Sequence, residues 1–231
     1  GKKKDKALSS VAMAPPGPPP PVYVTDACLP LGTTETFVSP WDGDAYVFRP
    51  YSKGSDLDAC RKQTWPLLNK GENSWCTFAH SGQCSLAGAY QPQLPKGPDT
   101  QFYALSGYYH LWQFLRLPRT TTLGAIERKG REICKLSMSG LQAWNAALPE
   151  SRENAEFLTS YCFLAAYVVT LVHDGYGFSM DDKFVFVNKI NDYKVDWALG
   201  SMLYEINALP WRYVGPGAGK VNDTAAAAVA A

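Results

Sequence analysis

The candidate acid and base carboxylates are aspartates, most of which lie at turns or before expected helices, where helix capping alone would place them. These aspartates are Asp26, Asp174, Asp181, Asp182 and Asp196. A hydrolase or transferase needs a nucleophile, an acid or base, and a place where charge can develop. No G-x-S-x-G motif surrounds any serine, so the sequence gives no indication of a serine hydrolase. The sequence therefore predicts no catalytic centre.

The three histidines, His80, His110 and His173, lie far apart in the sequence and do not form a visible metal-ligand cluster. His110 sits inside the aromatic run "GYYHLW". A histidine in that setting is either a residue of the core or a pocket wall, or a catalytic base, and its aromatic neighbours favour the first interpretation.

The stretch "GPGAGK" invites comparison with a phosphate-binding loop, G-x-x-x-x-G-K-[ST]. The comparison fails because Val214 stands where the first glycine belongs and Val221 follows the lysine. A glycine-rich linker explains the stretch.

The cysteines are six in number, never occur as C-x-x-C, and are spread along the chain. They are Cys28, Cys60, Cys76, Cys84, Cys134 and Cys162. The pattern disfavours zinc and favours three disulfides formed in an oxidising compartment, with buried free thiols as the alternative. About fifteen pairings are possible, and spacing does not choose among them. A lone glycosylation sequon at Asn222 also fits a secreted chain.

Composition excludes several classes of protein. Of 231 residues, 46% are hydrophobic and 13% aromatic, which is ample for a core. The net charge of +1 gives no field that would attract nucleic acid or an anionic membrane, so neither is an expected partner. The strongly apolar run "FLAAYVVTLV" is only about half of the roughly 20 residues that a membrane-spanning helix needs, and no span is expected in this chain.

The chain divides into three parts by composition. Residues 1–21 form a Lys/Pro-rich arm with polyproline character, which we expect to be flexible. Residues 22–210 carry the folded lobe, and residues 211–231 form a Gly/Ala-rich tail or linker without a packing pattern.

Periodicity predicts strands within 45–51 and 183–190, a strand running into a helix over 102–118, and helices within 120–136 and 139–148. Thr122 is the expected cap of the first of these helices. The strongest helix lies within 154–178 and is stopped by glycines. Its expected core stripe is Leu158, Cys162, Ala165, Val169 and Val172. Elsewhere between residues 22 and 76 we expect loops.

The segment "KINDYKVDWALGSML" ends in a helical pattern, because Val195, Leu199, Met202 and Ile206 fall on one face. We expect a short buried helix. Gly200 inside it costs roughly 1 kcal/mol relative to alanine, so another group is expected to approach the backbone there.

Five blocks, in order, resemble the C-terminal part of the ecto-nucleoside triphosphate diphosphohydrolases, or apyrases. They are "DACLPLG", "CTFAHSGQCSLAGAYQPQL", "FYALSGYYHLWQFL", "SYCFLAAYVVTLVHDGYGF" and "DWALGSMLYEINALP", and they span about residues 22 to 210. The resemblance implies an α/β fold: a helix-rich lobe of an actin-like (ribonuclease-H-like) two-lobe fold, stapled by disulfides. It also implies the pairs Cys28–Cys60, Cys76–Cys84 and Cys134–Cys162.

The resemblance implies hydrolysis of the terminal phosphates of nucleoside tri- and diphosphates, with Ca or Mg held between two lobes. The phosphate-binding loops and the catalytic glutamate of such enzymes precede the part represented here. This chain alone is therefore expected to hydrolyse nothing and to bind no metal, and its expected partner is the missing N-terminal lobe or other chains of an assembly. The expected location is extracellular, at the cell surface or in the secretory pathway.

In family members the nucleotide base is sandwiched between a tyrosine and an arginine. Those places fall on His110, directly after Tyr109, and on Phe157. Aromatic faces can still stack a base, but loss of the guanidinium weakens the case for nucleotide affinity. Trp197 is expected either to buttress the cleft or simply to belong to the core, and Gly200 to allow close packing.

Two classes of function follow. The chain is either one piece of a working apyrase or a degenerate apyrase-like lobe, a pseudoenzyme used as a structural or adhesion module of an extracellular assembly. A third interpretation, a carbohydrate- or ligand-binding module, is supported only by the aromatic content.

Overall fold

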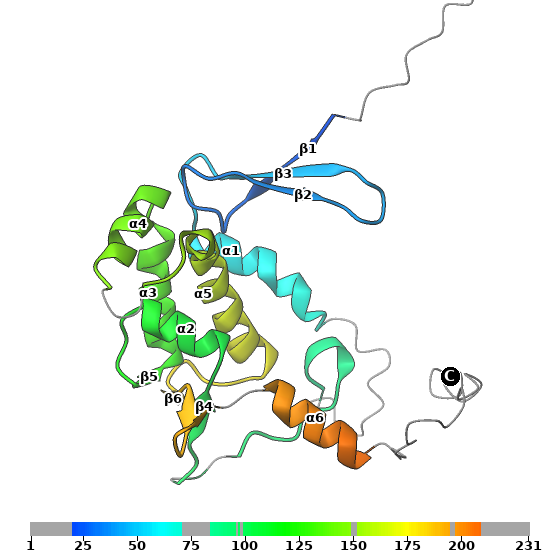
Figure 1. Cartoon of the computed structure of the whole chain (residues 1–231), viewed down its shortest axis with the longest axis vertical. Helices are drawn as coiled ribbons and strands as arrows, with labels where there is room; N and C mark the ends of the chain where they lie inside the picture. The colour runs from blue at the N-terminus through cyan, green and yellow to red at the C-terminus, as the bar shows by residue number, and fades with distance from the viewer. Residues whose placement is uncertain are drawn as a thin grey trace, which may run out of the picture. The chain divides into compact units, whose positions relative to one another are not determined.

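The computed structural model describes residues 20–70, 84–95, 97, 99–148, 152–194 and 197–208. The chain divides into two compact units, Gly1–Val187 and Asn188–Ala231. The folded lobe expected over 22–210 therefore spans parts of both units. Figure 1 shows the elements of each.

The first sheet of unit 1 consists of β1 (Val22–Asp26), β2 (Glu35–Val38) and β3 (Ala45–Pro50) in the order β1-β3-β2. β3 pairs parallel with β1 and antiparallel with β2. β3 confirms the strand predicted within 45–51. A hydrogen bond from the Ser39 amide to the Asp44 carbonyl, 2.9 Å long, closes the hairpin between β2 and β3.

A helix that the sequence analysis did not predict follows this sheet. It is α1 (Leu57–Thr64), continued by a 3-10 turn, η1 (Trp65–Leu68). The Asp56 side chain caps α1 by accepting a hydrogen bond from the Ala59 amide at 2.8 Å. Leu57, Cys60 and Thr64 are buried at helical spacing. The short apolar face was hidden among turn residues.

The second sheet consists of β4 (Phe102–Ala104), β5 (Thr120–Thr122) and β6 (Lys183–Phe186) in the order β4-β6-β5. β6 pairs parallel with β4 and antiparallel with β5. α2 (Gly107–Phe114) follows β4 closely, which confirms the predicted strand running into a helix. β5 occupies the first residues of the predicted range 120–136, and the helix itself begins at Leu123, directly after the expected cap Thr122. Another short 3-10 turn, η3 (Leu86–Gly88), precedes β4.

α3 (Leu123–Cys134) and α4 (Met138–Ala146) confirm the next two predicted helices. The Thr122 hydroxyl accepts a hydrogen bond from the Ala125 amide at 3.2 Å, as expected of the cap. The Ser137 hydroxyl likewise accepts a hydrogen bond from the Gly140 amide at the start of α4. At both helix starts a side-chain oxygen takes the place of the backbone acceptor that the first amides lack.

The predicted strongest helix is continuous from η4 (Ala155–Ser160) through α5 (Tyr161–Val169) to a π-helical segment, η5 (Thr170–Gly175). All five residues of its predicted core stripe are buried. The helix ends where predicted, and Gly177 takes a positive φ of 83° just after it.

The whole helix, Ala155–Gly175, has 21 residues and is long and apolar enough to cross a membrane by length and composition. Its most apolar stretch is 56% buried. Because α5 packs against α1, α2 and α3, its role in the core accounts for the apolar composition. The expectation that this chain has no membrane span stays a prediction.

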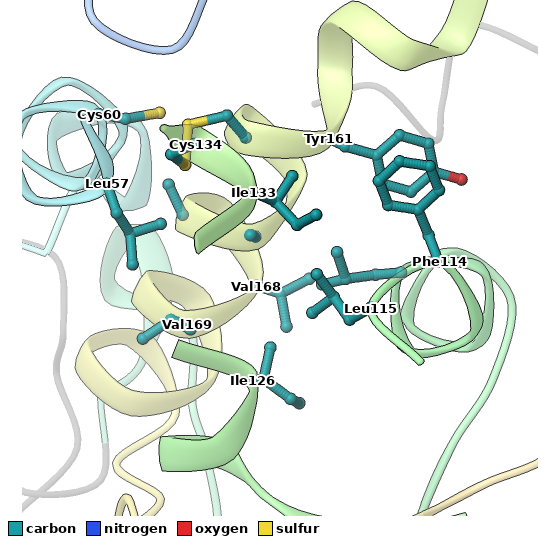
Figure 2. Close-up of a cluster of buried hydrophobic side chains, with 14 of the residues drawn as sticks. Leu57, Cys60, Phe114, Leu115, Ile126, Ile133, Cys134, Tyr161, Val168 and Val169 are labelled. Atoms are coloured by element: carbon teal, nitrogen blue, oxygen red, sulfur yellow. A yellow bond between two sulfur atoms is a disulfide. The ribbon is translucent and has the colours of Figure 1, made fainter. Parts of the chain in front are cut away.

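The core of unit 1 gathers around α5, as Figure 2 shows. The rings of Phe114 on α2 and Tyr161 on α5 stack with centroids 3.6 Å apart. Leu57 comes from α1, and Ile126 and Ile133 come from α3. Four helices therefore share one hydrophobic cluster.

Two of the disulfide pairs implied by the resemblance are confirmed: Cys28–Cys60 and Cys134–Cys162, with Cα–Cα distances of 4.9 and 4.8 Å. Cys84 is also disulfide-bonded, and its expected partner Cys76 lies outside the described residues. Among the described cysteines there is no free thiol. The alternative of buried thiols is therefore wrong for these positions.

Unit 2 contains β7 (Lys189–Ile190), β8 (Tyr193–Lys194) and α6 (Trp197–Ala208). The predicted helix exists, but the prediction that it is buried is wrong for its described residues, none of which is buried. Nothing lies within 4 Å of a Cβ added at Gly200, and Val195 lies outside the described residues. Two two-residue strands and one helix cannot enclose a core, which explains the exposure.

Gly130 provides a test of the contact between α3 and α5. A Cβ at Gly130 would lie 2.8 Å from the Ala165 Cβ. We expect Gly130→Ala to lower the free energy of unfolding, because overpacking costs about 1 to 3 kcal/mol and exceeds a helix-propensity gain of about 1 kcal/mol. Denaturant unfolding measures the change. Gly107→Ala is the control, since nothing lies within 4 Å of its added Cβ; equal stability of the two variants would contradict the prediction.

The Cys134–Cys162 bond provides a second test. It joins residues separated by 28 positions, and on the chain-entropy model such a loop stabilises the fold by about 3 to 4 kcal/mol. We expect the double variant Cys134→Ala, Cys162→Ala to unfold at much lower denaturant concentration. Adding a reductant to the unaltered chain is expected to cause at least as large a loss, because it also breaks Cys28–Cys60. If neither change lowered the denaturant concentration at half-unfolding, the stabilising role of this disulfide would be disproved.

Candidate functional site

α2 presents the first expected base-binding position. Tyr109 is half-buried and His110 is exposed on this helix. The Tyr109 ring lies 5.2 Å from that of Trp112, which stacks on Phe186 of β6 with centroids 5.8 Å apart and planes 10° apart. The Trp112 indole also donates a hydrogen bond to the Pro118 carbonyl at 2.7 Å. This aromatic ladder fixes α2 on the sheet and leaves His110 at the surface.

His110 faces an acidic residue from a distant part of the sequence. Its Nδ1 lies 3.7 Å from Oε1 of Glu153, and the glutamate side chain is mostly buried. Asn145 of α4 clamps the backbone of Glu153: its Nδ2 donates to the Glu153 carbonyl at 2.8 Å and its Oδ1 accepts from the Glu153 amide at 2.9 Å. The position of Glu153 is therefore set by the core and not by a mobile side chain.

Tyr161 lies on the inner side of Glu153. Burial raises the pKa of the Tyr161 phenol well above its usual value, and the neighbouring Glu153 carboxylate raises it further. Tyr161 therefore stays neutral at physiological pH and can stabilise the carboxylate by donating a hydrogen bond to it. Glu153 is held between a buried phenol and an exposed imidazole.

Phe157, the second expected base-binding position, lies on η4, four residues after Glu153. Its side chain is 51% exposed. His110 and Phe157 are 47 positions apart in the sequence. The structure places them on segments that meet through the His110–Glu153 contact. Phenylalanine can offer a ring face to a ligand but no hydrogen bond.

Trp197 belongs to unit 2, where its side chain is 80% exposed on α6. It is not a core residue among the described parts of that unit. Its assignment as a buttress of the nucleotide cleft stays a prediction.

Three of the aspartates singled out from the sequence have side-chain partners in the structure, while the printed hydrogen bond of Asp181 comes from its backbone amide to the Ser179 hydroxyl. Asp26 accepts a hydrogen bond from the Cys28 amide at 2.7 Å. Asp182 accepts one from the Ser179 amide at 2.7 Å. Asp174 bonds Arg61 at 2.9 Å. These contacts support turn and helix-end roles for the carboxylates, while Asp196 lies outside the described residues.

Within the described ranges there is no group of three or more His, Cys, Asp or Glu side chains arranged to hold a metal ion. His80 and the sequon at Asn222 lie outside those ranges. The expectation that this chain alone binds no metal stays a prediction.

Sequence reasoning missed Glu153 and its two supports, Asn145 and Tyr161. Glu153 lies in a polar loop without periodicity, so no short-range pattern marks it. Asn145 did carry a signal: with Leu141 and Leu148 it falls at spacings of four and three, on the buried face of a helix. A polar residue at such a position needs a buried hydrogen-bond partner.

Comparison with known proteins places these features in context. The model of the GDA1/CD39 (nucleoside phosphatase) family matches residues 2–222. The chain is 30% identical to nucleoside-diphosphatase mig-23 of Caenorhabditis briggsae, over 82% of this chain and 34% of that protein. It is 27% identical to probable apyrase 6 of Arabidopsis thaliana, over 78% and 32%, and 28% identical to ectonucleoside triphosphate diphosphohydrolase 7 of Xenopus tropicalis, over 81% and 29%. The chain spans about a third of the length of these relatives.

If His110 and Phe157 hold a nucleotide base, their rings contribute to binding and not to the chemical step. We expect His110→Ala and Phe157→Ala, each in an assembly that hydrolyses nucleotides, to raise KM about fivefold or more with little change in kcat, because loss of one stacked ring costs about 1 kcal/mol or more. Steady-state phosphate release measures both constants.

Trp41→Ala is the matched control, because Trp41 is an exposed ring of the β2–β3 hairpin. An unchanged KM in both site variants, or an equal rise in the control, would remove these residues from the base site.

Proposed function

Because the chain belongs to the GDA1/CD39 (nucleoside phosphatase) family, we propose that it forms the C-terminal, base-side lobe of an apyrase-like enzyme that hydrolyses nucleoside tri- and diphosphates. The observation that carries this proposal is the family match over residues 2–222, by a chain that spans about a third of its relatives' length. The mixed sheet β4-β6-β5 packed against helices is consistent with a ribonuclease-H-like lobe of an actin-like fold.

In this proposal the surface formed by His110 and Phe157 stacks the nucleotide base. Glu153 orients the His110 ring, since its backbone is held by Asn145 and its carboxylate lies beside the imidazole. Tyr109 anchors the helix that carries His110. The departure from the family's tyrosine and arginine predicts weaker base binding than in relatives that retain the guanidinium.

The chemistry on the phosphates belongs to another part of the protein. Phosphoryl transfer depends on positioned cations that neutralise the developing charge, and the described residues offer no cluster for such an ion. In this proposal Ca or Mg is held mainly by the missing N-terminal lobe, as the resemblance to the family implies. The contribution of this chain is to bind and orient the base.

The proposed location is extracellular, at the cell surface or in the secretory pathway. The disulfides Cys28–Cys60 and Cys134–Cys162 favour an oxidising compartment. One similar protein is named an ectonucleoside triphosphate diphosphohydrolase.

A second candidate is a degenerate lobe that serves as a structural or adhesion module. The observation in its favour is the apolar surface of the β1-β3-β2 sheet, where Tyr23, Val38 and Trp41 are exposed. Exposed aromatic side chains of this kind are typical of protein interfaces. Phe157 in place of the family's base-stacking arginine also favours a degenerate lobe.

The deciding experiment joins this chain to the two thirds of the Caenorhabditis briggsae nucleoside-diphosphatase that it does not match. We expect the isolated chain to release no phosphate from nucleoside di- or triphosphates with Ca or Mg, and the joined protein to release it, because only the latter combines base and phosphate sites. Colorimetric phosphate detection measures the rate.

The unmatched two thirds alone are the control. Metal-dependent hydrolysis by the isolated chain would overturn the assignment of catalysis to the other lobe. A folded but inactive joined protein would favour the degenerate module.

A further inference from the structure

The β1-β3-β2 sheet lies outside the hydrophobic core of unit 1. None of the residues of its three strands is buried. Among the described residues, none of these strand residues belongs to the core cluster or packs against it. A small sheet is stable in water when an apolar face is covered, and parallel pairs such as β1–β3 occur almost only in covered sheets. This sheet therefore has room for a covering segment.

One face of the sheet is continuously apolar. Val22 of β1, Tyr46 of β3 and Phe37 of β2 are register partners and form a row across the three strands (Figure 1). Val24 and Phe48 form the next row on the same face. Register partners project to one side of a sheet, and so do alternate residues of a strand. Val22 and Phe37, at the two edges, are 44% and 49% exposed.

The opposite face mixes apolar and polar side chains. It carries Tyr23, Thr36 and Val38, together with Arg49 of β3. The Arg49 guanidinium lies 3.7 Å from the centroid of the Tyr23 ring, and this cation–π contact already covers the ring. The face with Phe37 and Tyr46 is therefore the one that gains more from a cover.

The Lys/Pro-rich arm joins the sheet at one end of this apolar row. Val22, the first residue of β1, directly follows "PPGPPPP" at residues 15–21. A polyproline II segment of that length spans about 22 Å, at about 3.1 Å per residue. β2 lies two strand spacings from β1, or about 10 Å. The arm is therefore long enough to cross the row from Val22 over Tyr46 to Phe37.

The chemistry of the prolines fits aromatic side chains better than strand pairing. Proline has no backbone N–H, so the arm cannot continue the hydrogen-bonded ladder between β1 and β3. Polyproline II segments bind instead by placing proline rings against aromatic side chains, at a low entropy cost because the segment is already extended. Tyr46 and Phe37 supply two such rings along the path of the arm.

The charges of the arm and of the sheet are complementary. Four lysines lie within residues 2–6, before the prolines. Glu35 of β2 is exposed and projects to the same face as Phe37, because it is the register partner of Phe48. Asp42, in the turn between β2 and β3, is exposed and accepts a hydrogen bond from the Tyr46 hydroxyl at 3.4 Å. An arm that crosses toward β2 brings its lysines to these carboxylates.

We propose that the Lys/Pro-rich arm of this chain folds back over the β1-β3-β2 sheet, with its prolines packed on Tyr46 and Phe37 and its lysines beside Glu35 and Asp42. The covalent link at Val22 favours the arm over a second copy or a separate protein, because it gives the arm an effective concentration of about a millimolar at the sheet. The docked arm covers one face and leaves the opposite face, with Tyr23 and Val38, to a partner. No nucleotide is involved, so the inference holds for either candidate function.

The test uses the whole 231-residue chain. Nuclear Overhauser contacts are expected between protons of the arm prolines and the rings of Tyr46 and Phe37. Phe37→Ser is expected to abolish them and to speed trypsin cleavage after Lys6 at least fivefold, because the lysines leave the sheet. Pro18→Ser with Pro19→Ser, which leaves the sheet unaltered, is expected to have the same two effects. This second variant decides the matter if Phe37→Ser disturbs the fold.

Val38→Ser is the matched control. Val38 is the neighbour of Phe37 on the same edge strand and is 60% exposed, but it projects to the opposite face. We expect this variant to keep the contacts and to be cleaved after Lys6 within about twofold of the unaltered rate.

Absence of the contacts in the unaltered chain would overturn the proposal, and so would their survival in Phe37→Ser or in the proline variant. An equal loss in Val38→Ser would overturn it by showing that the effect does not depend on the face. Contacts that disappear on dilution would overturn it by identifying the arm of a second copy as the occupant.

Discussion

The close approach of α3 and α5 is the contact on which the rest of unit 1 depends. It is possible because Gly130 has no side chain where it faces Ala165, and Leu57 of α1 packs against the same point. The Cys134–Cys162 bond then joins the end of α3 to the beginning of α5. The backbones of three helices can therefore approach closely at Gly130, and larger side chains fill the space on either side of this contact.

The candidate site inherits its position from that contact. Tyr161 begins α5, stacks on Phe114 of α2, and lies beside Glu153. Glu153 in turn faces His110, on the exposed side of α2. Since α5 fixes Tyr161 and Tyr161 fixes α2, the separation between His110 and the segment carrying Phe157 is a consequence of core packing. A change in the core would alter ligand binding without touching a ligand.

What could be predicted from the sequence was local. The Thr122 cap, the core stripe from Leu158 to Val172 and the strand-to-helix pattern before α2 depend on neighbours within a few residues. α1 was missed because its apolar face is only three residues, and the burial of α6 was wrong because periodicity indicates an apolar face but not what covers it. The disulfide pairs came from resemblance, and the Glu153 contacts depend on pairing distant segments, which no spacing rule supplies.

Several arginines of unit 1 are paired with carboxylates. Arg61 is half-buried but bonds both Glu127 and Asp174 at 2.9 Å, and Arg131 is paired with Asp58. Cations already compensated by carboxylates cannot provide the net positive charge that a transferring phosphoryl group requires. The surface near His110 offers instead aromatic faces and one fixed carboxylate. If the chain forms the base-side lobe proposed above, changes to this surface alter base recognition and KM more than the barrier to phosphoryl transfer.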